Sequence, residues 1–126
     1  MNAVMRLPAT LAETVREDNQ SFISPSKVGE MLGLQAQVIA QRAGIHRNTL
    51  HARPQSERLQ GYLREVVRVM TVLEELTGGD IHRAAYLFKN VPLPEYRGLT
   101  PDELVAEGKT EAVLAYYESI LDGPSG

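Results

Sequence analysis

The sequence predicts an all-α fold, in which a helix-turn-helix bundle is joined by a long helix to a small C-terminal helical domain. Apolar side chains recur at steps of three and four residues along most of the chain, which is the spacing of one helix face. No stretch alternates apolar and polar side chains as a half-buried strand would. Helix-capping residues and glycines separate the apolar stretches, so several short helices and one long helix are expected.

Four regions are expected along the 126 residues. Residues 1–21 form an arm or a short helix, and residues 22–55 form the helix-turn-helix. Residues 56–78 form a connecting and dimerisation helix, and residues 79–126 form the C-terminal domain. The helical pattern of the first region is weak and consists of Leu7, Leu11 and Val15.

Three short helices are expected in the second region. Ser24 can cap the first of them, with Pro25 in the first turn, where its missing N–H costs nothing. Gly33 ends that helix, and Pro54 stops the third. The three helices are expected over residues 26–32, 36–43 and 47–52.

The turn between the last two of these helices has the residues that a steep helix crossing needs. Ala40 supplies a small side chain at the crossing, and Gly44 tolerates the positive φ of the turn. Ile45 and Leu50 then hold the second helix against the first. The side chains that point away from this contact are those of His46, Arg47, Asn48, His51 and Arg53.

Basic and amide side chains on such a face are typical of a recognition helix in the major groove of DNA. Arginine can bridge the two acceptors of guanine, and asparagine the donor and acceptor of adenine. We therefore expect this region to bind double-stranded operator DNA. Base contacts are expected from Arg47, Asn48 and His51, and phosphate contacts from Gln37, Thr49 and Arg53. The alternative is a tight corner of an all-α domain without DNA binding, since Ala, Gly and Leu are common at these offsets.

A long helix is expected from Ser56, which can cap it, to about Thr77. Its apolar side chains form one stripe: Leu59, Leu63, Val66, Val67, Met70, Leu73 and Leu76. We expect the helix to join the two halves of the chain and part of the stripe to meet a second copy.

Three more helices are expected in the last region. Asp80 can cap one over residues 81–89. Thr100 and Glu103 form a capping box that begins another, which ends near Gly108. The last runs over residues 110–121, and one of its faces carries Val113, Leu114, Tyr117, Ile120 and Leu121.

The net charge of −3 is divided unevenly. Residues 27–68 hold seven basic residues against three acidic ones, a local charge of +4. Residues 69–126 hold four against ten, a local charge of −6. The basic block could neutralise phosphates, whereas DNA would repel the acidic half, which is expected to serve another partner.

Other chemistry is not expected. The chain has no cysteine, which excludes disulfides and thiolate zinc sites. His46 and His51 are five residues apart and cannot share a ligand face, so no metal site is expected. No phosphate-binding loop or nucleophile motif is present, so we expect neither an enzyme nor a cofactor. No apolar run approaches the length of a membrane helix and no signal-peptide core opens the sequence, so a cytoplasmic protein without membrane contact is expected.

The C-terminal third carries an ordered set of short motifs. In chain order they are Val91-Pro92-Leu93, Gly98-Leu99-Thr100-Pro101 with Leu104, Glu107-Gly108, Ala112-Val113 and Ile120-Leu121-Asp122-Gly123. This order resembles the Xre/MbcA/ParS toxin-binding domain of antitoxins that are paired with RES-domain toxins. The upstream half resembles the Xre-type helix-turn-helix of such antitoxins, so the resemblance covers about residues 22–123. Many relatives have tryptophan where this chain has Tyr86 or Leu87.

The resemblance implies an antitoxin of a type II toxin-antitoxin pair. Such a protein is a homodimer that binds the promoter of its own operon and inhibits a RES-domain toxin that consumes NAD. The toxin-facing surface would lie within residues 92–126. The candidate contacts there are Arg97, Lys109, Tyr116 and Glu118.

Two alternatives stay open at this point. The chain could be a helix-turn-helix transcription regulator whose C-terminal half only dimerises or binds a small effector. It could also have lost DNA binding and kept toxin binding.

Overall fold

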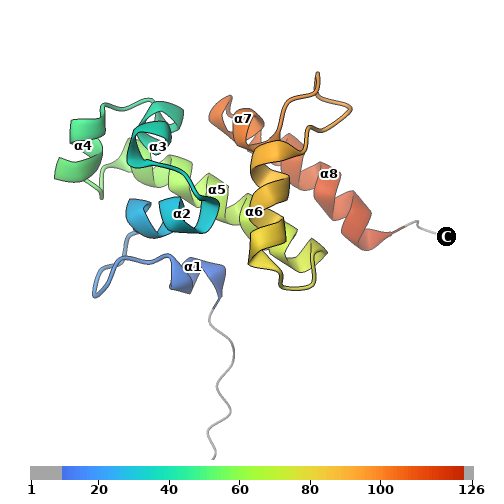
Figure 1. The fold of residues 1–126 in the computed structure, drawn as a ribbon, viewed down its shortest axis with the longest axis horizontal. Helices are drawn as coiled ribbons and strands as arrows, with labels where there is room; N and C mark the ends of the chain where they lie inside the picture. Colours follow the sequence, from blue (N-terminus) through green and yellow to red (C-terminus); the bar gives the residue numbers. More distant parts are fainter. Residues whose placement is uncertain (1–9, 124–126) are drawn as a thin grey trace, which may run out of the picture.

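The computed structural model describes residues 10–123, and this part of the chain contains eight helices and no strand. The all-α prediction is confirmed. The helices are α1 (Leu11–Thr14), α2 (Pro25–Leu32), α3 (Ala36–Ala43), α4 (Arg47–Ala52), α5 (Glu57–Leu76), α6 (Ile81–Asn90), α7 (Pro101–Ala106) and α8 (Thr110–Asp122). Figure 1 shows α5 running through the molecule, with α2, α3 and α4 around its first half and α6, α7 and α8 around its second.

The long helix α5 forms the centre of one continuous hydrophobic core. Its apolar stripe is covered from several sides, because α5 contacts α1, α3, α6, α7 and α8. Leu59, Leu63, Val66 and Leu73 are completely buried. The expectation that part of this stripe meets a second copy is therefore wrong for these residues, because other helices of the same chain already cover them. Only Leu76, at the end of the stripe, is half-buried.

Local capping signals fix most helix ends where the sequence predicts them. The Ser24 hydroxyl accepts a hydrogen bond from the N–H of Lys27, and Thr100 and Glu103 form the reciprocal capping box that begins α7. Gly33 ends α2 with a φ of 68°, in the left-handed region that glycine adopts without strain.

The first region contains only a single helical turn within the described residues. A capping box between Thr10 and Glu13 begins α1, and the chain then folds back on itself. An isolated antiparallel bridge joins Arg16 and Ile23. Leu11 and Val15 are buried in the core. The third residue of the predicted pattern, Leu7, lies outside the residues that the structure describes.

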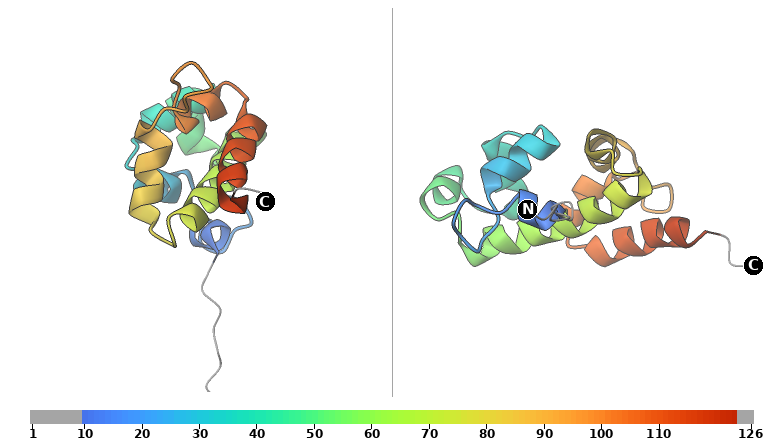
Figure 2. Two further views of the ribbon diagram at one scale, coloured as in Figure 1. Left: turned by 90° about the vertical axis from the view of Figure 1, so that its right-hand side faces the viewer. Right: turned by 90° about the horizontal axis from the view of Figure 1, so that it is seen from below.

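The last helix buries its apolar face only in part. Val113, Leu114 and Tyr117 are buried, whereas Ile120 is 46% exposed. The final turn of α8 lies at the edge of the molecule, where it projects beyond the other helices (Figure 2). The predicted face is thus correct as a helix face, but its last turn extends beyond the core.

Within residues 10–123, no helix is both long enough and apolar enough to cross a membrane.

Candidate functional site

The α3–α4 corner is held by backbone and side-chain contacts around its turn. Gly44 has a φ of 73°, and the N–H of Ile45 donates to the carbonyl of Ala40 at 2.9 Å. From α5, the Arg58 guanidinium donates to the Gly44 carbonyl at 3.2 Å. Ala40 and Leu50 are buried between the helices. The orientation of α4 is therefore fixed by both α3 and α5.

His46 is the N-cap of α4. Its Nδ1 accepts a hydrogen bond from the backbone N–H of Asn48 at 3.1 Å. A nitrogen that accepts carries no proton, so the neutral ring holds its proton on Nε2, which is left to donate outward. The sequence predicts only an outward-facing side chain for His46 and gives no sign of this capping role.

The candidate DNA-binding residues are mostly at the surface. Gln37, Arg47, Asn48, His51 and Arg53 are exposed, whereas Thr49 is half-buried. Arg53 is the C-cap of α4 and has already left the helix.

Two of these candidates lie in one hollow between α3 and the start of α4. The hollow measures about 450 Å³ and is lined by Gln37, Ala40, Gln41, Ile45, His46 and Arg47. Gln41 is not among the residues predicted to bind DNA, but it is four residues after Gln37 and therefore lies on the same helix face.

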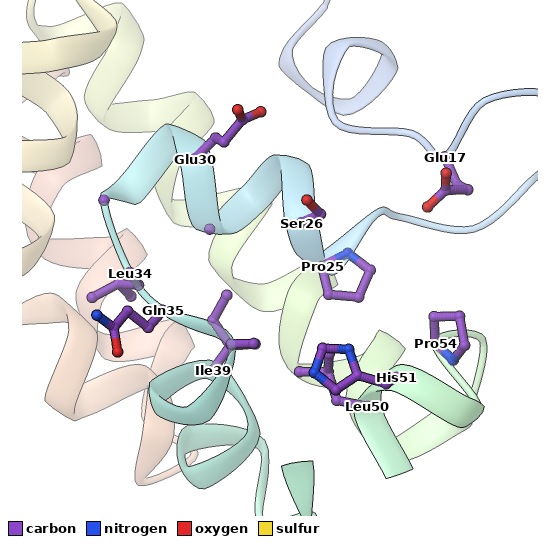
Figure 3. A pocket seen from close by; sticks show the side chains of 13 residues that line it. Glu17, Pro25, Ser26, Glu30, Leu34, Gln35, Ile39, Leu50, His51 and Pro54 are labelled. Carbon is purple, nitrogen blue, oxygen red and sulfur yellow. The ribbon is translucent and has the colours of Figure 1, made fainter. Parts of the chain in front are cut away.

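His51 lies in a different place. It lines a second hollow, between α2, α3 and α4, together with apolar side chains such as Ile39 and Leu50 (Figure 3). The six candidates therefore do not line a single groove: Gln37 and Arg47 share one hollow, and His51 borders another.

Much of the basic charge of residues 27–68 is neutralised within the chain. Lys27 pairs with Asp18, Arg64 with Glu57, and Arg68 with both Glu65 and Glu111. Arg42 pairs with Asp102. Among residues 10–123, Arg47, Arg53 and Arg58 form no ion pair. The unpaired positive charge of this block thus lies at the two ends of α4 and at the start of α5.

The pair between Arg42 and Asp102 joins α3 to α7. Both contacts are charge-assisted hydrogen bonds, at 3.1 and 3.2 Å, and Asp102 is 5% exposed. Burial raises the pKa of Asp102 above its ordinary value, and the guanidinium opposes that rise. Burial and the Asp102 charge together raise the pKa of Tyr62, whose buried hydroxyl has no hydrogen-bond partner in the described part of the chain.

The C-terminal candidates lie in three separate places. Arg97 and Lys109 both contact Glu107, at 3.2 and 3.7 Å. Tyr116 and Glu118 lie further along α8 and are about 200° apart around its axis, so they face opposite sides. The Tyr116 ring packs edge-on against Tyr117, with centroids 5.1 Å apart.

Glu118 belongs to an acidic hollow between the ends of α5 and α8. The hollow measures about 460 Å³, and three carboxylates line it, those of Glu75, Glu118 and Asp122. Val72 and Leu121 provide its apolar part. The acidic character of the second half is thus most concentrated at this end of the molecule.

Comparisons with models of known protein families, with curated proteins and with solved structures found no match.

Proposed function

We propose that this chain is a DNA-binding antitoxin of a type II toxin-antitoxin pair. In this proposal the α3–α4 corner binds the operator of its own operon as a homodimer, and the C-terminal half binds and inhibits a RES-domain toxin that consumes NAD. The observation that carries the DNA-binding half is the hollow between α3 and α4, which is lined by Gln37 and by Arg47, whose guanidinium forms no ion pair within residues 10–123.

This arrangement supports DNA binding through charge and through hydrogen bonding. Arg47 and Arg53 are exposed and unpaired in the described residues, so they can exchange counterions for phosphates without breaking an internal ion pair. Arg47 and Asn48 also carry side chains that can bridge two atoms of one base. Two such heads related by two-fold symmetry would bind half-sites about one helical turn apart.

Toxin binding is supported by the sequence motifs of the last third and by the acidic surface at the ends of α5 and α8. A protein that binds a dinucleotide phosphate commonly offers arginine side chains, and a carboxylate surface is complementary to them. The half-buried Leu121 lines the same hollow between these helix ends and adds apolar area to it.

The DNA-binding half is tested by fluorescence anisotropy with the DNA upstream of the reading frame and with a random duplex of equal length. Arg47→Ala is expected to weaken binding to the upstream DNA by about 1 to 3 kcal/mol more than binding to random DNA. Arg53→Ala is expected to weaken both about equally. Arg83→Ala is the matched control, because Arg83 is exposed on α6 and forms no ion pair in the described chain. Equal losses on both duplexes for Arg47→Ala would refute the base-reading role.

The toxin-binding half is tested by co-expression with the adjacent reading frame, followed by size-exclusion chromatography with light scattering. Deleting residues 92–126 would strip α7 and α8 from the core, so charge reversal on the surface is the cleaner perturbation. The double substitution Glu118→Arg and Asp122→Arg should release the protein encoded by the adjacent reading frame. The growth arrest and NAD loss that this protein causes should then return. Glu30→Arg, on exposed α2 surface in the other half, should leave the complex intact.

If the chain elutes alone as a DNA-binding dimer and the protein of the adjacent reading frame does not arrest growth, the result favours a plain transcription regulator with a C-terminal dimerisation or effector-binding region.

A further inference from the structure

The larger of the two hollows beside α4 has the size and lining of a small-molecule site. It measures about 520 Å³ and lies between α2, the start of α3 and α4 (Figure 3). Its apolar lining includes Pro25, Leu34, Ala36, Ile39, Leu50 and Pro54. Binding sites for small organic ligands are commonly about 300 to 1,000 Å³ and mostly apolar, with a few polar groups that orient the ligand.

A close backbone approach shapes one wall. A Cβ atom on Gly29 would lie 2.8 Å from the Leu34 carbonyl oxygen, a distance that backbone atoms cannot accept. The absence of this atom lets the segment after α2 pack against the helix, where the N–H of Leu34 donates to the Gly29 carbonyl at 2.9 Å. The wall is therefore made by packed backbone and does not depend on mobile side chains.

The polar groups at the hollow define the charge that it would accept. In Figure 3 the Glu17 carboxylate turns toward the side of Pro25 and Pro54, whereas the Glu30 carboxylate points away. Glu17 joins no ion pair within residues 10–123. The His51 imidazole also borders the hollow, from α4. An unpaired carboxylate beside apolar walls complements a cation that carries an apolar body, and it repels phosphate and other anions.

We propose that this hollow binds a small organic cation, whose aromatic or aliphatic body packs on the apolar lining of the hollow while its ammonium group pairs with Glu17. The bound molecule contacts His51, which stands on the helix assigned to DNA. Ligand and operator DNA therefore change each other's affinity by the same factor. This last step rests on the proposed DNA-binding function, whereas binding in the hollow does not.

The site is tested by titrating the ¹⁵N-labelled full chain with three indoles and following its amide signals. Tryptamine has an indole body with an ammonium group, 2-(indol-3-yl)ethanol is its neutral analogue, and indole-3-acetate is anionic. Tryptamine should shift the amide signals around the hollow, such as those of Gly29, Gly33 and His51, and should bind about threefold to fivefold more tightly than the neutral analogue. Indole-3-acetate should bind most weakly.

Two substitutions separate charge recognition from apolar packing. Glu17→Gln should remove the preference for tryptamine over the neutral analogue, whereas Glu75→Gln, a distant exposed carboxylate, should preserve it. Ala36→Phe places a ring in the hollow and should weaken all three indoles. Equal affinity of tryptamine and its neutral analogue for the unmodified chain would overturn the proposal. So would shifts that spread to α8 and leave the hollow unaffected.

The same samples distinguish failure of the site from failure of the proposed function. DNA affinity is measured by anisotropy with and without saturating tryptamine, and the expected result is a change in the dissociation constant that Glu17→Gln reduces. If tryptamine binds in the hollow but the chain binds no DNA, the site stands and the DNA-binding function falls. If DNA binding is intact and no indole shifts the signals around the hollow, the site falls and the function stands.

Discussion

Gln60 ties three segments of the chain together, and its removal should destabilise the fold severely. The side chain is 5% exposed. Its Oε1 accepts from the N–H of Ile23 at 2.9 Å, and its Nε2 donates to the carbonyls of Ile23 and Pro54, both at 2.8 Å. Gln60→Leu keeps the approximate size of the side chain and leaves these three backbone groups without their partner. The segment before α2 and the α4–α5 connection would both lose their attachment to α5.

The expected loss follows from the number of groups left unpaired. A buried polar group without a partner costs about 1 to 3 kcal/mol, and Ile23 is only half-buried, so water recovers part of this. Burial of the leucine side chain offsets about 1 kcal/mol more of the loss in the free energy of unfolding. We expect a net loss of about 2 to 4 kcal/mol in the free energy of unfolding.

Urea unfolding followed by circular dichroism at 222 nm measures this loss. Gln41→Leu is the matched control, because Gln41 is exposed and its replacement should change stability by less than about 0.5 kcal/mol. A loss below about 1 kcal/mol for Gln60→Leu, with an unchanged dependence on urea, would refute this account of the three hydrogen bonds.

Three further predictions concern single substitutions. Asp102→Asn should lower the free energy of unfolding by about 2 to 4 kcal/mol, because Arg42 is left without its charged partner. Urea unfolding at pH 7 measures this loss, and an unchanged free energy of unfolding would contradict the prediction. Gly44→Ala should lower the free energy of unfolding by about 1 to 2 kcal/mol, because the φ of 73° at this position disfavours a Cβ atom. The control in the same assay is Gly61→Ala, because Gly61 lies within helix α5 and does not have a positive φ. Hydrogen bonds from the Thr100 backbone and hydroxyl lower the pKa of Glu103. The ionised Glu103 side chain therefore stabilises the folded state fully above about pH 4.5, and this stabilisation is lost as the pH falls through the lowered pKa. Glu103→Gln should therefore flatten this part of the acid unfolding profile, and an unchanged profile would count against the capping box as its cause.

The parts of the fold that depend on local chemistry could be predicted from the sequence. Ser24 with Pro25, the Thr100 capping box and Gly44 each act on residues within a few positions, and they fix helix ends at those places in the structure. The stripe of α5 is also a local pattern. It indicates which face is buried, but not which helices cover it, and this is why a second copy was expected where α6, α7 and α8 of the same chain lie.

The features that the sequence did not predict depend on contacts between distant residues. Arg42 and Asp102 are 60 positions apart, and Gln60 and Ile23 are 37 apart, so no local spacing connects them. The candidate site shows the same limit. The sequence indicates which side chains of α4 point outward, but the separation of Arg47 and His51 into two hollows depends on how α2 and α3 pack against that helix.

The single core around α5 has a genetic consequence. Since both halves of the chain pack on the same helix, a substitution that loosens α8 also reduces the population of molecules in which α4 is correctly held. Under the proposed function, a screen for loss of operator binding would therefore recover changes far from α4, along every element that covers α5. On that proposal, such changes should lower DNA binding and partner binding by a common factor, whereas changes on the exposed face of α4 should affect DNA binding alone.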